Sequence, residues 1–232
     1  MRVVIAGAHG GIGLRLGRLL ADRGDAVSGI VRNPAHRADL EAAGMQPVVL
    51  DLERVTPEDL AQRIEGADAV VFSAGAGAGS GIPRKDTVDR AAAVLLADAA
   101  ERAGVRRYLL VSSMGVDQVR DGATPEGVDP GFVVYLRAKL AAEEDLRRRD
   151  LDWLVLRPGH LTDEPGTGHV TLGPGTGRSD VPRDDVAAVI AALLEHLRRD
   201  PAAARRVLDV VSGPDPVVDA VERAIAAGSP SS

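Results

Sequence analysis

The stretch AGAHGGIG, residues 6–13, follows the apolar run RVVI at residues 2–5 and precedes an amphipathic segment at residues 14–24. Gly7, Gly10 and Gly13 have the spacing Gly-x-x-Gly-x-x-Gly between a predicted buried strand and a predicted helix. In a dinucleotide site the first glycine permits a tight turn, the second lets the backbone approach the diphosphate, and the third lets the helix pack on the strand. The first N–H groups of the helix then face the phosphates. The stretch therefore predicts dinucleotide binding, and a glycine-rich loop without a ligand is the alternative.

Apolar strands and amphipathic helices alternate along the rest of the chain. The strands are apolar almost without interruption, which indicates burial on both faces. This alternation predicts a doubly wound parallel α/β sheet, a Rossmann fold, with a small C-terminal extension on the substrate side. Strands are predicted at residues 3–7, 26–31, 47–50, 69–74, 108–113, 153–158 and 207–213, and helices at residues 11–23, 34–43, 57–65, 86–103, 130–149, 183–198 and 215–227. Residues 1–228 are predicted to form a single NAD(P)-binding domain and residues 229–232 a disordered tail.

Helix-capping residues support several of these boundaries. Thr56 and Asp129 each precede a proline, and both are predicted to be N-caps. In the segment VPRDDVA at residues 181–187, Asp184 or Asp185 is predicted to cap the next helix. The stretch AGAGAGSG at residues 74–81 is predicted to be a loop after the fourth strand, where such sheets usually leave room for a ligand.

The composition argues against several classes of function. The chain has 232 residues and a net charge of −6, so no general affinity for nucleic acid or anionic membranes is expected. It has no cysteine, which excludes disulfides, thiolate metal sites and a cysteine nucleophile. The five histidines show no metal-ligand spacing, so no metal site is predicted. The N-terminus resembles neither a signal peptide nor an anchor, and a cytoplasmic protein is expected. The strong preference for arginine over lysine is typical of GC-rich bacteria.

The end of the second predicted strand indicates which dinucleotide is bound. NAD sites usually carry an acidic residue there, which contacts the ribose hydroxyls. Here Arg32 occupies the position, Arg37 is nearby, and no acid follows until Asp39. Because a guanidinium matches a 2′-phosphate, NADP is predicted over NAD, with a solvated arginine as the alternative. Asp51, at the end of the third strand, is a candidate contact for the adenine amino group.

Several motifs, in this order, resemble the short-chain dehydrogenase/reductase superfamily, in its extended and atypical branch. These are the glycine spacing above, YLLVSSMG at residues 108–115, YLRAK at residues 135–139 and LRPGHL at residues 156–161. The similarity covers residues 1 to about 212, and within the branch the small NAD(P)-binding, NmrA-like group is most similar. The resemblance implies a Rossmann fold and hydride transfer with a nicotinamide cofactor.

The Tyr-x-x-x-Lys element carries the chemistry that this resemblance implies. Tyr135 and Lys139 are four residues apart on a predicted helix, so their side chains share one face about 5–6 Å apart. A phenol has a pKa near 10, and an adjacent ammonium and an oxidised nicotinamide both favour the phenolate. By resemblance Tyr135 protonates the substrate oxygen, Lys139 also holds the nicotinamide ribose, and Ser113 or its neighbour Ser112 hydrogen-bonds the carbonyl oxygen. A surface tyrosine beside an exposed lysine is the alternative.

The remaining site residues are assigned by the same resemblance. The superfamily has an asparagine on the helix after the fourth strand, and Asp89 stands at that position here. The segment Pro158–Leu161 is expected beside the nicotinamide, with His160 a polar lining residue or a contact to cofactor or substrate. The candidate catalytic residues are thus Ser113, Tyr135, Lys139 and Asp89. The candidate cofactor-binding residues are Gly7, His9, Gly10, Gly11, Ile12, Gly13, Arg32, Asp51, Leu52, Ser73, Ala74, Gly75, Lys139, Pro158, Gly159 and Leu161.

These assignments predict an NADP-dependent oxidoreductase that transfers hydride between nicotinamide and a small carbonyl or alcohol substrate. The alternatives are a non-catalytic NADP-binding sensor or regulator, a flavin- or biliverdin-type reductase, and an epimerase-like enzyme. The substrate pocket is expected to be built by loops at residues 74–86, 114–130 and 159–180. A small-molecule substrate and a monomer or homodimer are expected, without a nucleic-acid or membrane partner.

Overall fold

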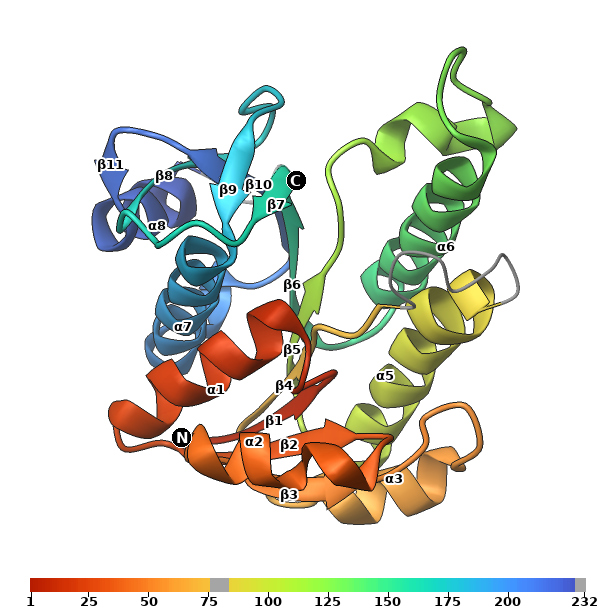
Figure 1. Cartoon of the computed structure of the whole chain (residues 1–232), viewed down its shortest axis with the longest axis vertical. Helices are drawn as coiled ribbons and strands as arrows, with labels where there is room; N and C mark the ends of the chain where they lie inside the picture. The colour runs from red at the N-terminus through yellow and green to blue at the C-terminus, as the bar shows by residue number, and fades with distance from the viewer. Residues whose placement is uncertain (76–83, 228–232) are drawn as a thin grey trace.

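The computed structural model of the chain describes residues 1–75 and 84–227, in alternating strands and helices (Figure 1). The strands are β1 (Arg2–Ala6), β2 (Ala26–Val31), β3 (Gln46–Val49), β4 (Ala69–Phe72), β5 (Arg107–Val111), β6 (Asp152–Pro158), β7 (His160–Thr162), β8 (His169–Gly173), β9 (Asp180–Pro182), β10 (Arg206–Ser212) and β11 (Asp215–Pro216). The α-helices are α1 (Gly11–Asp22), α2 (Arg37–Ala42), α3 (Pro57–Ile64), α5 (Ala92–Ala103), α6 (Pro130–Arg147), α7 (Arg183–Arg199) and α8 (Val217–Ala226). Shorter helical segments are η1 (Pro34–His36), η2 (Lys85–Ala91), η3 (Val116–Gly122) and η4 (Pro201–Ala203).

Nine of the strands in the described residues form one large sheet with the order β11-β8-β10-β6-β5-β4-β1-β2-β3, and β7 and β9 form a second, small sheet. The seven strands from β3 to β10 in this order are parallel, and they are the seven strands predicted from the sequence. The order reverses between β1 and β4, because the chain leaves the β1–β3 half of the sheet and returns on the other side of β1. In such sheets a ligand binds at this switch point, at the carboxyl ends of the strands. The predicted doubly wound fold is confirmed.

Two layers of helices cover the sheet, and each strand alternates its side chains between them. Val3 and Ile5 of β1 join a core with α1, α7 and α8, whereas Val4 and Ala6 join a second core with α3 and α5. Figure 1 views the sheet nearly edge-on, with α1 and α7 on one side and α5 and α6 on the other. Burial on both faces explains why these strands are apolar without interruption.

The segment 159–180 differs most from the prediction. It was expected to be a loop, but it contains β7, β8 and the first residue of β9. β8 pairs antiparallel with the edge of β10, and β7 pairs with β9 in a separate small sheet. The glycines of this segment are typical of turns, so the sequence did not predict these strands. The strands are stabilised by partners far away in the sequence.

Helix boundaries differ in smaller ways. The helix predicted at 34–43 is divided into η1 and α2, and that predicted at 86–103 begins with the π-helical segment η2 before α5. The predicted caps Thr56 and Asp129 are confirmed, since their side chains accept the N–H groups of Asp59 at 3.2 Å and Phe132 at 2.9 Å.

The capping role predicted for Asp184 or Asp185 is wrong. The N-cap of α7 is Pro182, which has no side-chain cap. Asp184 instead binds Arg15 at 2.7 Å, and Asp185 accepts the N–H groups of Thr167 and Gly168. Both carboxylates therefore hold the loop before β8 against α7.

Two of the remaining predictions concern residues that the structure does not describe. Residues 76–81 of the predicted glycine-rich loop and the predicted tail at 229–232 lie outside the described residues. The single domain over residues 1–228 stays a prediction. Among the described helices, none combines the length and apolar character needed to cross a membrane.

Candidate functional site

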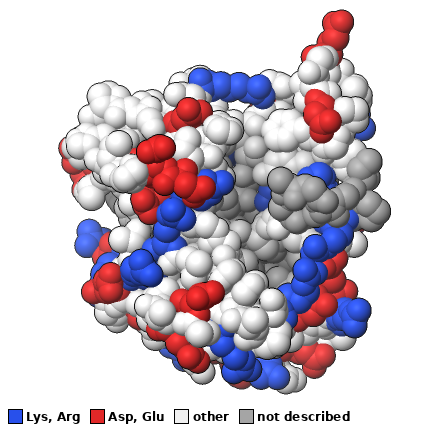
Figure 2. Space-filling view, in the orientation of Figure 1, with Lys and Arg blue, Asp and Glu red and all other residues white. Residues whose placement is uncertain are grey.

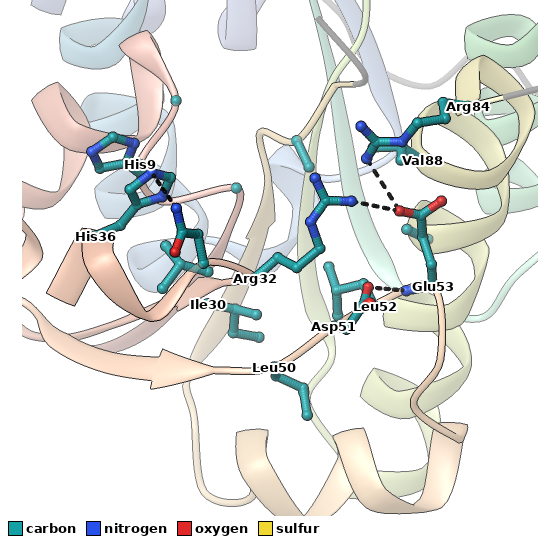
Figure 3. Close-up of a pocket in the computed structure, with 16 residues that line it drawn as sticks. His9, Ile30, Arg32, His36, Leu50, Asp51, Leu52, Glu53, Arg84 and Val88 are labelled. Atoms are coloured by element: carbon teal, nitrogen blue, oxygen red, sulfur yellow. Dashed lines mark hydrogen bonds and ion pairs between the residues drawn. The ribbon is translucent and has the colours of Figure 1, made fainter. Parts of the chain in front are cut away.

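A cavity of about 330 Å³ lies at the carboxyl ends of β1, β2 and β3, next to the switch point of the sheet (Figure 3). Its apolar lining comes from the ends of β2 and β3 and from the start of α5, and its polar lining from the loops that follow β1, β2 and β3. Its lining residues are Gly7, His9, Gly10, Ile30, Val31, Arg32, Asn33, His36, Leu50, Asp51, Leu52, Glu53, Ala74, Arg84, Val88 and Ala92.

The glycine stretch brings bare backbone to one side of this cavity. Gly7 has a φ of +82°, and a Cβ built on it would lie 2.5 Å from the Cα of Ala74. A Cβ on Gly13 would lie 2.5 Å from the carbonyl oxygen of Gly7, so a side chain there would push α1 away from β1. The N-cap Gly10 offers no side-chain cap, and the first turn of α1 contains no acid. The first-turn N–H groups of α1 are thus available to an anion.

Arg32 lies in the cavity, but a carboxylate already contacts it. Arg32 Nη1 lies 2.9 Å from Glu53 Oε2, and Arg84 Nη2 lies 3.1 Å from the same oxygen (Figure 3). Thr87 donates a hydrogen bond of 2.6 Å to the other oxygen of Glu53. This hydrogen bond, followed by the charges of Arg84 and Arg32, holds the pKa of Glu53 below its usual value despite partial burial. Glu53 is therefore ionised at neutral pH.

Glu53 and Arg84 were not among the residues predicted from the sequence. β2 and β3 are adjacent and parallel, so the segments that follow them meet at one edge of the sheet. This adjacency brings Glu53 next to Arg32, and the run LDLE at residues 50–53 was the available signal. Arg84 precedes η2 on the opposite wall, and no local pattern indicated it.

Two histidines line the cavity on the side of the glycine stretch. The rings of His9 and His36 stack with centroids 3.5 Å apart and planes 8° apart. His9 Nε2 lies 2.8 Å from Asp39 Oδ2, which orients the ring. Figure 3 shows this stack on one side of the cavity, whereas the side chain of Arg32 points away from it toward Glu53.

These features fit a dinucleotide. Ile30, Leu50 and Val88 give the cavity apolar walls for a flat base, and Gly7 and Gly10 give a close approach of backbone. The Oγ of Ser73, next to Ala74, is buried and has no hydrogen-bond partner among the described residues. A buried hydroxyl in that position is ready to bond a ligand. Asp51 lines the cavity too, and its Oδ1 accepts the N–H of Glu53 at 3.0 Å.

The Tyr135–Lys139 pair lies on α6, where Lys139 is next to the carboxyl ends of β4 and β5. The Nζ of Lys139 is 5.8 Å from the centroid of the Tyr135 ring. Lys139 is only 3% exposed and contacts Asp89 Oδ1 at 3.4 Å, the carbonyl oxygen of Val111 at 3.1 Å and that of Ala74 at 3.4 Å. The ammonium therefore links the ends of β4 and β5 to α6. Asp89 forms a buried ion pair with Lys139, at the position where the resembling family has asparagine.

The two serines after β5 have different surroundings. Ser112 is 4% exposed and donates a hydrogen bond of 2.5 Å to the buried carboxylate of Glu143, so it belongs to the core. Ser113 is half-buried, and its hydroxyl donates to the carbonyl of Met114 at 3.1 Å. The N–H of Met114 donates to the carbonyl of Pro158 at 3.0 Å, which joins the segment after β5 to the end of β6. Of the two serines, Ser113 is the one accessible to a substrate.

The other predicted residues do not line the cavity. Ile12 is 7% exposed and packs in the core, so only its backbone is available to a ligand. A Cβ on Gly75 would lie 3.2 Å from Asp89, which places Gly75 beside the Lys139 ion pair. His160 is exposed and pairs with Asp180 at 3.1 Å. The predicted residues outside the cavity lining are Gly11, Ile12, Gly13, Ser73, Gly75, Ser113, Tyr135, Lys139, Asp89, Pro158, Gly159 and Leu161.

Comparison with known proteins matches the chain with one family and with a curated relative of the same size. Residues 7–197 match the model of a family described as NAD(P)H-binding. The chain is 33% identical over 224 residues to YhfK of Bacillus subtilis, named an uncharacterised sugar epimerase, with 96% of this chain and all of that protein covered.

Two solved structures extend this comparison. A Bacillus halodurans protein, provisionally described as an NAD-dependent epimerase/dehydratase, superimposes with a TM-score of 0.85 at 32% identity, over 96% of this chain and 99% of that one. ChuY of Escherichia coli O157:H7, described as an anaerobilin reductase, superimposes with a TM-score of 0.74 at 27% identity, over 91% of this chain and 97% of that one.

Proposed function

This chain belongs to the NAD(P)H-binding family of oxidoreductase- and epimerase-like proteins, and on that premise we propose that it is an NADP-dependent oxidoreductase. It transfers hydride between the nicotinamide and a small carbonyl or alcohol substrate. The observation that carries the proposal is the contact of Lys139 with both halves of the site. Its Nζ lies 3.4 Å from the carbonyl of Ala74, which lines the cavity, and 5.8 Å from the Tyr135 ring.

In this proposal, some residues of the site bind the cofactor and others bind the substrate oxygen or transfer the proton. Gly7, Gly10 and the first turn of α1 bind the diphosphate, and Arg32 with Arg84 faces the adenosine end. When bound, the nicotinamide supplies or accepts the hydride. Ser113 hydrogen-bonds the substrate oxygen, and Tyr135 donates the proton that this oxygen gains as its carbon is reduced. Lys139 contributes positive charge beside the phenol, which favours loss of that proton.

An epimerase is the second candidate function. It is favoured by the names of the Bacillus subtilis relative and of the Bacillus halodurans structure. An epimerase returns the hydride to its substrate, so it causes no net oxidation of the cofactor. The reductase is favoured by the description of the Escherichia coli structure as a reductase. We further propose that the protein acts as a monomer or a homodimer.

Incubation of the purified protein with NADPH and a panel of quinones, flavins, aldehydes and ketones tests the proposed function. Loss of NADPH absorbance with at least one carbonyl compound is expected. Binding of NADPH without oxidation by any compound in the panel would contradict a reductase. The epimerase is then tested by conversion of nucleotide sugars without a change in cofactor absorbance.

Arg32→Glu is expected to lower the ratio of NADPH to NADH affinity by at least about tenfold, because hydrogen bonds to a charged group contribute about 1.5–3 kcal/mol. The wild type is expected to bind NADPH more tightly than NADH. Fluorescence titration with both cofactors measures the two dissociation constants. Arg54→Glu is the matched control, since Arg54 is 86% exposed on the neighbouring segment. Equal affinity of the wild type for both cofactors would contradict the assignment of Arg32.

Glu53→Gln is expected to tighten NADPH binding by about two- to fivefold, because the carboxylate repels a 2′-phosphate and competes for Arg32. Since the pKa of Glu53 is lowered, the carboxylate is charged throughout the neutral range and the effect is present there. The effect fades as the pH falls through that pKa. Glu58→Gln is the control, because Glu58 pairs with Arg102 outside the cavity. Weaker NADPH binding by Glu53→Gln would show that the carboxylate positions the arginines instead.

A further inference from the structure

Both lysines of the chain lie against the same aromatic ring. The Nζ of Lys85 is 5.4 Å and that of Lys139 is 5.8 Å from the centroid of Tyr135. The sequence contains only these two lysines and 26 arginines, since Lys and Arg total 28. Lys139 is accounted for by the reaction proposed above. Lys85 comes from a different segment, η2, and has no role in that reaction.

The two ammonium groups differ in what surrounds them. Lys139 is buried, and its Nζ contacts Asp89 and two backbone carbonyls. Lys85 is half-buried, and none of the ion pairs among the described residues includes it. The acids closest in sequence are paired with other cations: Asp86 with Arg90 at 2.6 Å and Asp89 with Lys139 at 3.4 Å. Glu53, across the site, contacts Arg84, Thr87 and Arg32.

An apolar surface adjoins the ammonium of Lys85. Phe132, one turn before Tyr135 on α6, stacks on the tyrosine ring with centroids 5.6 Å apart and is 41% exposed. An exposed aromatic ring beside a catalytic tyrosine offers a surface for a flat apolar molecule. The ammonium of Lys85, which lies over the Tyr135 ring, offers a partner for an anion.

A second cation reaches this region from the C-terminal half of the chain. The guanidinium of Arg178 lies against Gly115, where a Cβ would overlap it, and the same position lies beside Leu136 of α6. No ion pair among the described residues includes Arg178. Figure 2 shows a hollow down the middle of this face, with both basic and acidic side chains along its sides. Lys85 and Arg178 are thus two cations near Tyr135 and Leu136 in addition to Lys139, and no ion pair among the described residues includes either of them.

We propose that Lys85 determines substrate specificity by binding a carboxylate of the substrate, and that the physiological substrate is an apolar carbonyl or alcohol compound bearing such a group. The proposal rests on the proposed function, since it places the reacting oxygen at Tyr135. Phe132 and the Tyr135 ring receive the apolar body, Lys85 receives the carboxylate, and Arg178 adds positive charge beside Gly115. A compound of the same shape without the charge binds less tightly, because it leaves the ammonium without a partner.

Binding of benzoate and of benzamide to the NADP-saturated protein tests the proposal by calorimetry. Benzoate is expected to bind the wild type more tightly than benzamide. Lys85→Met is expected to weaken benzoate about tenfold or more, with benzamide unchanged. Lys85→Arg keeps the charge and is expected to retain most of the benzoate affinity. The control is Arg148→Met at the far end of α6, where the side chain is 71% exposed, and it is expected to change neither affinity.

The ratio of benzoate to benzamide affinity decides the outcome. A ratio that is the same in the wild type and in Lys85→Met overturns the proposal. If the variant weakens only NADPH binding, the ratio is also unchanged, and the ammonium then binds the cofactor diphosphate instead. The kinetic arm compares para-formylbenzoate with its methyl ester, and kcat/KM is expected to favour the acid only when Lys85 is present. If neither aldehyde is reduced while the binding ratio still depends on Lys85, the proposed reaction fails and the anion site stands.

Discussion

Tyr135→Phe is expected to lower carbonyl reduction about 100- to 10,000-fold, the range that a positioned general acid contributes. The variant removes only the phenolic hydroxyl and leaves the ring that contacts Phe132, Lys85 and Lys139. NADPH affinity is therefore expected to stay within about twofold of the wild type. Initial rates of NADPH oxidation and a fluorescence titration measure the two effects.

Tyr108→Phe is the matched control for this prediction, because Tyr108 is the other tyrosine of the chain. It is buried in the core, and its hydroxyl donates to the carbonyl of Ala93 at 2.9 Å. Loss of this hydrogen bond is expected to lower the free energy of unfolding by about 1 kcal/mol without changing turnover. Full activity of Tyr135→Phe would exclude the phenol as the proton donor and favour a flavin- or biliverdin-type reductase, in which hydride transfer needs little side-chain catalysis.

The largest stability effect is expected from Glu143→Ala. Glu143 is fully buried on α6 and accepts hydrogen bonds from Ser112 at 2.5 Å, from Arg157 at 2.6 and 2.9 Å, and from Arg147 at 3.0 Å. Removing Glu143 leaves the buried guanidinium of Arg157 with Asp117 as its remaining acidic partner and leaves Ser112 without its acceptor, so the free energy of unfolding is expected to fall by about 3–5 kcal/mol. For a chain of this size that corresponds to a fall in Tm of roughly 10 °C.

Denaturant unfolding followed by circular dichroism measures this difference. Glu144→Ala is the control on the next residue, where the side chain is 44% exposed, and a change within about 0.5 kcal/mol is expected. Glu143→Leu combined with Arg157→Met is expected to recover much of the lost stability, because it removes both charges. Equal stability of Glu143→Ala and Glu144→Ala would show that the buried network contributes little to the fold.

This network also bears on the site. Glu143 lies on the helix that carries Tyr135 and Lys139, and Arg157 connects it to Asp117 of η3 at 2.6 Å. Burial alone would raise the pKa of Asp117, but hydrogen bonds from Arg120 and Arg157 lower it overall, so this carboxylate also stays charged. The network thus anchors α6 to β5, β6 and the segment that follows Ser113. Glu143→Ala is therefore expected to reduce kcat as well as stability.

The sequence by itself determined the layers of the fold and the two motifs of the site. Strand apolarity, the glycine spacing after β1 and the interval from Tyr135 to Lys139 are local patterns, because they depend on residues within one or two turns of one another. The cap at Thr56 belongs to the same class. These features were predicted correctly since the backbone geometry of a helix or strand fixes how near residues are arranged.

Only the tertiary structure decided which side chains from distant segments meet. The pairing of Glu53 with Arg32, the approach of Lys85 to Tyr135, the bond from Ser112 to Glu143 and the pairing of β8 with β10 each join residues whose contact follows from the order and register of the sheet. Such contacts leave no periodic trace along the chain, and the role of Asp184 and Asp185 was misjudged for that reason. The sequence therefore indicated a dinucleotide, a role for Arg32 and a proton donor, whereas the contact of Glu53 with Arg32 and the approach of Lys85 to Tyr135 became visible only in the tertiary structure.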